Sequence, residues 1–154
     1  MVSFSLCMIV KDEEAVLSRC LDSLHDIMDE IIIVDTGSTD KTKEIARKYT
    51  DKIFDYKWCN DFADARNFAA SKATGDYIYT ADADEYLDAE NRDKLCQLKK
   101  IMLPEIEIVQ MLYHTPAGLS TVYNFEEEYR PKLYKRLRTF SWIDQIHELS
   151  LIHI

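Results

Sequence analysis

The chain has 154 residues, of which 47% are hydrophobic and 31% are charged, which is enough apolar material for one packed domain. Its formal net charge of -9 argues against binding to nucleic acid, because phosphate backbones repel an acidic protein. The four cysteines form no CxxC pair, which argues against a zinc site. The apolar run near the N-terminus is too short to cross a bilayer. We therefore expect no transmembrane segment and a cytoplasmic protein, either free or peripheral to the inner membrane face.

Strand and helix patterns alternate along the first half of the chain. Residues 2–10 are apolar and rich in β-formers, residues 13–27 carry apolar side chains at helical spacing, and residues 30–35 form an Ile/Val run typical of a parallel strand covered on both faces. The pattern continues with a helix over 41–49, a weaker strand over 52–56, an Ala-rich helix over 62–73 ended by Gly75, a strand over 76–81, a helix over 91–102, and strands over 107–114 and 132–138. This order predicts an α/β fold, an open and mostly parallel sheet with helices on both faces.

Acidic residues follow two of the predicted strands. Ligands of open α/β sheets bind beyond the carboxyl ends of the strands, where Asp35 and the pair Asp82 and Asp84 are expected. If the segment after the strand is extended, Asp82 and Asp84 point the same way, and their oxygens suit Mg²⁺ or Mn²⁺. The alternative is an acidic turn that faces solvent.

Two further positions allow a structural or a functional interpretation. A helix N-terminus explains Gly37 and Ser38, but Asp35 ends an apolar strand, so it either caps the turn locally or meets a ligand. Arg66 could bind a diphosphate bidentately, although an ion pair with Asp61 or Asp64 is the simpler interpretation.

Four ordered blocks within residues 5–87 resemble the family 2 glycosyltransferases of the GT-A (nucleotide-diphospho-sugar transferase) fold. The blocks are SLCMIVKDEE, IIIVDTGSTDKTKEIA, FADARNFAASKATGDYI and DADEYL. The chain is most similar to a bacterial branch with an Ile-His-Glu element after the sheet, and residues 146–148 have that sequence. The resemblance implies inverting transfer from a nucleotide-diphosphate sugar, a UDP-sugar above all, with Mn²⁺ or Mg²⁺ as cofactor.

The resemblance also implies roles for individual residues. The nucleotide-sugar-binding residues would be Met8, Val10, Glu14, Asp35, Thr36, Arg66, Asp82 and Ala83, and the metal ligands would be Asp82, Asp84 and His147. The catalytic base would be Glu148 or, as the second candidate, Asp144. Many family members have a second aspartate where this chain has Thr36. Uracil as the nucleobase of the donor is therefore less firmly implied than the diphosphate. The alternative for residues 146–148 is an ordinary strand end.

The acceptor is unknown: a glycan, a lipid-linked sugar or a peptide, with a hydroxyl or an amine that receives the sugar. We expect a catalytic domain over residues 1–148 that is incomplete at its C-terminus, with residues 149–154 as a non-native tail. One alternative is a nucleotidyltransferase, although that class has a basic, Gly-rich loop where this chain has Lys-Asp-Glu-Glu at 11–14. The other alternative is a catalytically incomplete fragment that binds nucleotide sugar.

Overall fold

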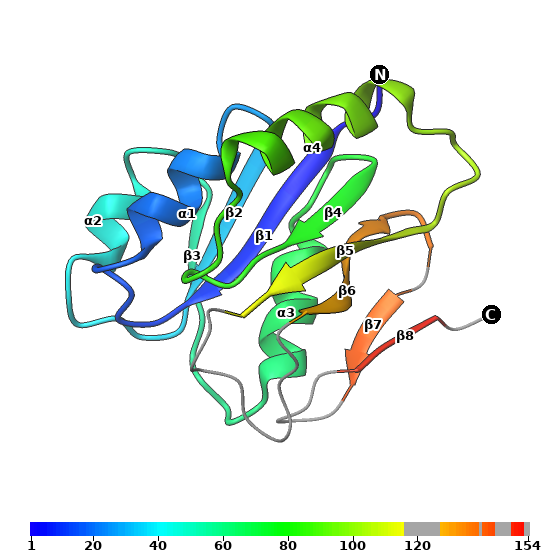
Figure 1. The fold of residues 1–154 in the computed structure, drawn as a ribbon. Coiled ribbons are helices and arrows are strands. Elements are labelled where there is room, and N and C mark those ends of the chain that lie inside the picture. Colours follow the sequence, from blue (N-terminus) through cyan, green and yellow to red (C-terminus); the bar gives the residue numbers. More distant parts are fainter. Residues whose placement is uncertain (116–126, 139, 144–148, 153–154) are drawn as a thin grey trace.

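The computed structural model describes residues 1–115, 127–138, 140–143 and 149–152, the last four by their backbone only. Its described part contains a six-stranded sheet in the order β3-β2-β1-β4-β6-β5 and a two-stranded sheet, β7-β8 (Figure 1). The strands are β1 (Phe4–Val10), β2 (Glu30–Asp35), β3 (Ile53–Asp55), β4 (Tyr77–Thr80), β5 (Ile108–His114), β6 (Glu127–Lys135), β7 (Phe140–Ile143) and β8 (Leu149–Ile152). The helices are α1 (Leu17–Leu24), α2 (Thr42–Ala46), α3 (Phe62–Ser71) and α4 (Ala89–Ile101).

The first four strands are parallel, as predicted from the strand–helix alternation. β1 lies between β2 and β4, and β3 extends the sheet beyond β2. β6 and β5 then continue it on the other side in antiparallel orientation. The carboxyl ends of the four parallel strands therefore lie along one edge of the sheet, which we call the ligand edge.

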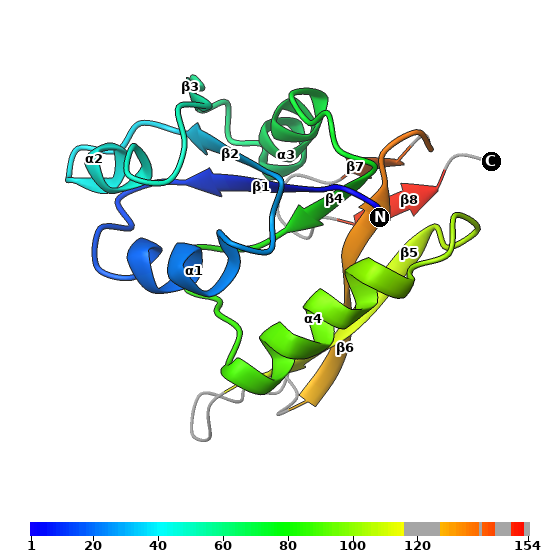
Figure 2. The ribbon, with the colours of Figure 1, turned by 90° about the horizontal axis from the view of Figure 1, so that it is seen from above.

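Helices cover both faces of the sheet, which confirms the predicted layers. Alternate residues of β1 face opposite sides, because side chains in a strand alternate. Phe4, Leu6 and Met8 pack with α1 and α4, whereas Cys7 packs with α3. Figure 2 shows α1 and α4 on one side of the strands and α3 on the other.

The prediction that Gly75 ends the helix before it is wrong. α3 ends at Ser71, and Gly75 lies beside the start of β1. A Cβ atom at Gly75 would lie 2.6 Å from Ser5 Oγ, and the Gly75 N–H donates to that oxygen at 2.9 Å. The close approach of two backbones therefore requires the glycine.

Some predicted bounds were also wrong. α1 begins at Leu17 and not at residue 13, because Val16, the residue before it, has a φ of -122° and lies outside the helical region. β6 begins at Glu127, five residues before the predicted start, and strands β7 and β8 were not predicted.

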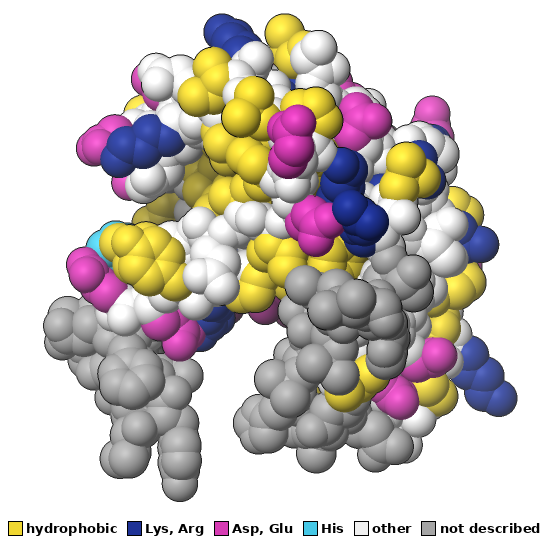
Figure 3. All heavy atoms as spheres, turned by 90° about the vertical axis from the view of Figure 1, so that its right-hand side faces the viewer, with side chains coloured by type: hydrophobic (Ala, Val, Ile, Leu, Met, Phe, Trp, Pro, Cys, Tyr) yellow, Lys and Arg dark blue, Asp and Glu magenta, His cyan; other side chains and the backbone are white. Residues whose placement is uncertain are grey.

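The other end of the sheet carries apolar surface. Figure 3 shows hydrophobic side chains exposed between acidic and basic ones on one face of the molecule. Ile101, Leu103 and Leu137 are 61 to 77% exposed. Their neighbours in sequence bond to the amino end of β4, since Tyr77 donates to the Ile106 carbonyl and Arg136 to the Gly75 carbonyl. This surface is therefore separate from the ligand edge.

Candidate functional site at the ligand edge

The loops that follow β1 and β2 are joined to each other at the ligand edge. The Asp12 N–H donates to Ser38 Oγ at 2.9 Å, and Asp12 Oδ1 accepts the Thr39 N–H at 2.7 Å. Glu14 Oε2 accepts the Lys41 N–H at 2.9 Å. Asp12 has a φ of 53°, a left-handed conformation that these bonds support. The two loops thus form one surface, and Glu14, predicted to bind the nucleotide, has a structural partner there.

Asp35 ends β2 and has one satisfied and one unsatisfied oxygen. Its Oδ1 accepts the N–H groups of Gly37 at 3.0 Å and Ser38 at 2.9 Å. Its Oδ2 is buried and has no hydrogen-bond partner among the described residues, and the residue is only 1% exposed. A buried acceptor without a partner costs free energy. The local capping interpretation therefore explains one oxygen and leaves the other for a ligand.

Thr36 supports the backbone. Its hydroxyl donates to the Val10 carbonyl at 3.2 Å, and its side chain is buried. The following Gly37 has a φ of +111°, which favours glycine. Met8, Val10 and Ala83, also predicted to bind the nucleotide sugar, have buried side chains. As whole residues these three are at most 4% exposed, so this structure offers a ligand little of their surface.

The segment after β4 is a turn over residues 82–85, here called the acidic turn. The Glu85 N–H donates to the Asp82 carbonyl at 3.1 Å. The prediction that Asp82 and Asp84 face the same way because the segment is extended is therefore wrong, since turn geometry and not strand alternation sets their directions. The Asp84 side chain is exposed, and no described residue bonds to its carboxylate.

Arg66 reaches the acidic turn from α3. Its Nη2 atom lies 2.9 Å from Asp82 Oδ1, and neither Asp61 nor Asp64 is its ion-pair partner. The structure thus corrects the simpler interpretation of Arg66. Asp61 instead caps α3 by accepting the Asp64 N–H at 3.0 Å.

The cations around Asp82 set its protonation. Partial burial alone would raise the pKa of Asp82, but Arg66, with Lys132 and Arg130 beyond it, lowers the pKa below its ordinary value. Asp82 is therefore ionised at neutral pH, and its side chain is still 49% exposed.

Glu13, which the sequence reasoning missed, shows that the electrostatic potential of this edge is negative. Burial raises the pKa of Glu13, and the negative charges of Asp84, Asp40, Asp82 and Asp12 raise it further. A protein places like charges together at a cost that a bound cation can offset. The only signal in the sequence was the run of acids after the first strand.

The residues present fit a small hard cation that is shared with a ligand. The described residues contain no group of three or more His, Cys, Asp or Glu side chains that could enclose a metal. Mg²⁺ nonetheless binds commonly through one or two carboxylates, several waters and substrate phosphates. The exposed Asp84 and the half-exposed Asp82 supply oxygens of that kind.

Two residues that hold the acidic turn were not among the predicted site residues. Glu85 and Lys132 form an ion pair whose side chains are 11% and 12% exposed. Lys132 comes from β6, and Arg130 of the same strand lies over the Tyr113 ring, 3.9 Å from its centroid. No local sequence pattern relates β6 to the acidic turn. The predicted base candidates Glu148 and Asp144, and the predicted metal ligand His147, lie outside the described residues and stay predictions.

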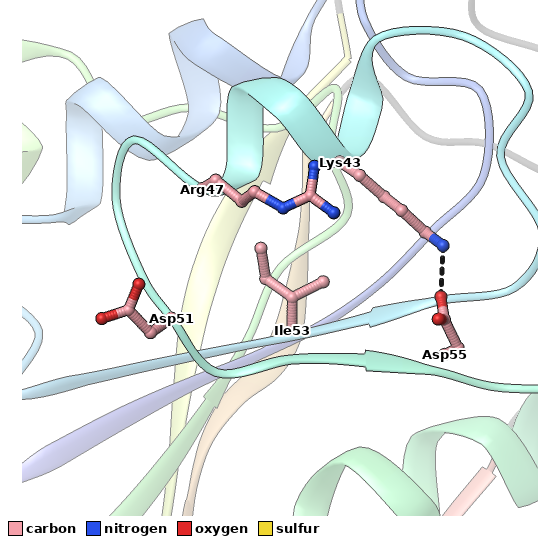
Figure 4. A pocket seen from close by; sticks show the side chains of 5 residues that line it. All are labelled: Lys43, Arg47, Asp51, Ile53 and Asp55. Atoms are coloured by element: carbon pink, nitrogen blue, oxygen red, sulfur yellow. Dashed lines mark ion pairs between the residues drawn. The ribbon is translucent and has the colours of Figure 1, made fainter.

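A hollow lies between α2 and β3, next to Asp35. It has a volume of about 200 Å³ and is lined by Lys43, Arg47, Asp51, Ile53 and Asp55 (Figure 4). Lys43 pairs with Asp55 there, and its Nζ also lies 3.8 Å from Asp35 Oδ1. Pockets for drug-sized ligands measure roughly 300 to 1,000 Å³, so this hollow is too small for a nucleotide sugar.

Residues 5–151 match glycosyl transferase family 2, and this is most of the chain. The chain belongs to this family. The resemblance seen in the four sequence blocks is thereby confirmed.

Several curated proteins are similar to this family 2 chain. A TPR repeat-containing protein of Synechococcus elongatus is 50% identical over 90 residues, which are 58% of this chain and 22% of that protein. The SPbeta prophage-derived glycosyltransferase SunS of Bacillus subtilis is 38% identical over 96 residues, which are 61% of this chain and 23% of SunS. The chain thus spans less than a quarter of the length of these two relatives.

Solved structures share the fold. The crystal structure of S. aureus TarS 1-349 superposes with a TM-score of 0.53 at 25% identity, over 64% of this chain and 32% of TarS 1-349. The same protein in complex with UDP-GlcNAc gives a TM-score of 0.50 at 25% identity, over 64% and 31%. The predicted GT-A fold is confirmed. Among the described residues, no helix combines the length and the apolar character needed to cross a membrane.

Proposed function

We propose that this family 2 chain binds a UDP-sugar together with Mn²⁺ or Mg²⁺ and transfers the sugar, with inversion, to an acceptor hydroxyl or amine. The observation that carries the proposal is the acidic ligand edge, where the Asp84 carboxylate stands exposed beside the half-exposed Asp82. The family match and the glycosyltransferase relative SunS support sugar transfer. The complex of TarS with UDP-GlcNAc supports uridine diphosphate as the carrier.

Asp35 is the residue that we assign to the nucleoside. Its Oδ2 is a buried acceptor to which no residue in the described part of the chain donates, and the neighbouring loops carry backbone N–H and C=O groups. A ring N–H or a ribose hydroxyl would satisfy that oxygen, and the oxygen would in turn fix the orientation of the ligand. Glu14 and Thr36 would keep the loops around Asp35 in place through their hydrogen bonds with Lys41 and Val10.

Asp84 and Asp82 are the residues that we assign to the metal, and we assign Asp82 also to the ribose beside it. A divalent cation, when bound, stabilises negative charge on the departing diphosphate. Arg66 orients the Asp82 carboxylate, and its guanidinium lies close enough to the acidic turn to meet a diphosphate there. His147 as a further metal ligand stays a prediction from the sequence.

An inverting transfer needs a base on the acceptor side, opposite the leaving diphosphate. Asp82 and Asp84 cannot serve, because the metal and the diphosphate would occupy their side. Glu148, with Asp144 as the second candidate, stays the predicted base. The acceptor, whether glycan, lipid-linked sugar or peptide, and a cytoplasmic location, either free or at the inner membrane face, stay predictions as well.

A radiolabelled donor tests the reaction class. Incubation with UDP-[¹⁴C]GlcNAc and Mn²⁺ should release UDP and labelled sugar, either to an added acceptor or slowly to water. A second incubation with UTP and GlcNAc 1-phosphate should release no pyrophosphate; its release would show nucleotidyl transfer and overturn the proposal. If UDP-GlcNAc raises the melting temperature only when Mn²⁺ is present but no sugar is released, the chain is a donor-binding fragment.

A further inference from the structure

Glu85, the last residue of the acidic turn, forms a nearly buried ion pair with Lys132 of β6. Lys132 Nζ lies 2.7 Å from Glu85 Oε1 and 2.6 Å from Oε2, so it bridges both carboxylate oxygens. Desolvating two charges costs about as much free energy as their attraction returns, so such a pair is weak support for stability alone. Its position at the ligand edge calls for another role.

Glu85 also closes the acidic turn through two hydrogen bonds with Asp82. Its Oε2 accepts the Asp82 N–H at 3.1 Å, and its own N–H donates to the Asp82 carbonyl at 3.1 Å. The same carboxylate is held by Lys132, which lies on β6, a strand paired with β4 through Leu133 and Tyr79. The conformation of the turn therefore depends on a strand about fifty residues further along the chain.

We infer that Glu85 and Lys132 are positioning residues that fix the acidic turn so that Asp82 and Asp84 present their carboxylates to one divalent cation. The inference rests on the proposed function of this edge. Mg²⁺ and similar cations demand a near-ideal arrangement of oxygens, so a loosened turn binds them less tightly. Groups that orient metal ligands typically contribute about 10- to 100-fold to metal affinity.

The test variant replaces both partners, E85M/K132M, and keeps the net charge. Removing Lys132 alone would make the edge more negative and attract cations, and removing Glu85 alone would do the opposite. With both charges gone, a change in affinity reports the geometry of the turn. Binding of Mn²⁺ is followed by the EPR signal of the free ion, on the whole chain and with saturating UDP. We expect the Kd for Mn²⁺ to rise about 10- to 100-fold.

The chain offers a matched control at the opposite edge. Lys99 Nζ lies 2.6 Å from Asp29 Oδ2, which also accepts a backbone N–H, that of Phe4 at 2.7 Å. Lys99 is 12% exposed, as is Lys132, whereas Asp29 is 46% exposed and Glu85 11%. The variant D29M/K99M should keep the Kd for Mn²⁺ within about twofold, because it removes one positive and one negative charge far from the turn. The conservative variant K132R should also keep it, because the charge remains.

Thermal unfolding without metal separates positioning from folding. A melting temperature of E85M/K132M near that of the parent, combined with the weaker Mn²⁺ binding, supports the inference. If E85M/K132M does not fold, E85Q/K132M carries the test, because glutamine keeps an acceptor for the Asp82 N–H. An unchanged Kd in a folded variant overturns the inference. If that happens while D84N loses Mn²⁺ binding, the proposed function stands; if the parent binds no Mn²⁺, both fail.

Discussion

Two substitutions of Asp35 should affect nucleotide binding and the stability of the fold to different extents. Asp35→Asn keeps an acceptor at the Oδ1 position, where the N–H groups of Gly37 and Ser38 bond. It replaces the unpartnered Oδ2 by an amide N–H₂ group of nearly the same size. Asp35→Ala removes both acceptors. The two variants therefore differ chiefly in the turn, and they share the loss of the carboxylate.

The magnitudes follow from the bonds that each variant loses. Each bond from Gly37 or Ser38 to Asp35 is comparable to a helix cap, which contributes about 1 to 2 kcal/mol. Asp35→Ala should therefore lower the free energy of unfolding by about 2 to 4 kcal/mol. Asp35→Asn should change it by about 1 kcal/mol or less, because the buried oxygen that it replaces accepts no hydrogen bond from the residues that the structure describes.

Affinity for UDP should respond differently. A hydrogen bond to a charged acceptor contributes about 1.5 to 3 kcal/mol, so Asp35→Asn should weaken UDP binding about 10- to 150-fold. Calorimetric titration gives the Kd, and urea unfolding of the same samples gives the stability. If Asp35→Asn binds UDP as tightly as the parent, the free oxygen does not meet the nucleotide, and the reasoning is refuted.

Three further changes test other parts of the structure. Gly75→Ala should lower the free energy of unfolding by about 1 to 3 kcal/mol, because its Cβ would meet the Ser5 hydroxyl; a melting temperature equal to that of the parent would contradict this. Burial alone would raise the pKa of Glu30, but hydrogen bonds from Lys52, Ser5 and Thr74 lower it from 4.5 to about 2. That carboxylate should stabilise the fold by about 3 kcal/mol above pH 4.5, and the contribution should disappear as the pH falls towards 2. Urea unfolding of Glu30→Gln should therefore differ from the parent at pH 7 and converge with it in acid, and a constant difference would refute the pKa. Glu148→Gln, in a form of the protein that transfers sugar, should keep the Kd for UDP and lose most of the turnover; a parental rate would move the base to another carboxylate.

Much of the fold was predictable because short stretches of sequence determine the individual strands and helices. The Ile/Val run of β2 and the helical spacing of Leu17 and Leu21 each indicate one element, and their alternation indicates a parallel sheet. The ends of elements were less predictable, since bonds between distant segments set them. Gly75 illustrates this, because its partner Ser5 lies seventy residues away in the sequence.

The candidate site was predictable only in part, for the same reason. Asp35, Asp82 and Asp84 follow strands, so their place at the ligand edge could be predicted from the topology of an α/β sheet. The pairing of Arg66 with Asp82, and of Lys132 with Glu85, could not, because each joins two elements whose relative position only the fold determines. The nearest acids in sequence were the wrong partners for Arg66.

The account depends most directly on whether UDP binds through a metal at the acidic turn. The measurement is the Kd for UDP by calorimetry, on the parent and on Asp84→Asn, with Mn²⁺ and again with excess EDTA. We expect tight binding by the parent only when Mn²⁺ is present, and weak binding by Asp84→Asn under both conditions with an unchanged melting temperature. Equal affinity with Mn²⁺ and with EDTA, or tight Mn²⁺-dependent binding by Asp84→Asn, would contradict it.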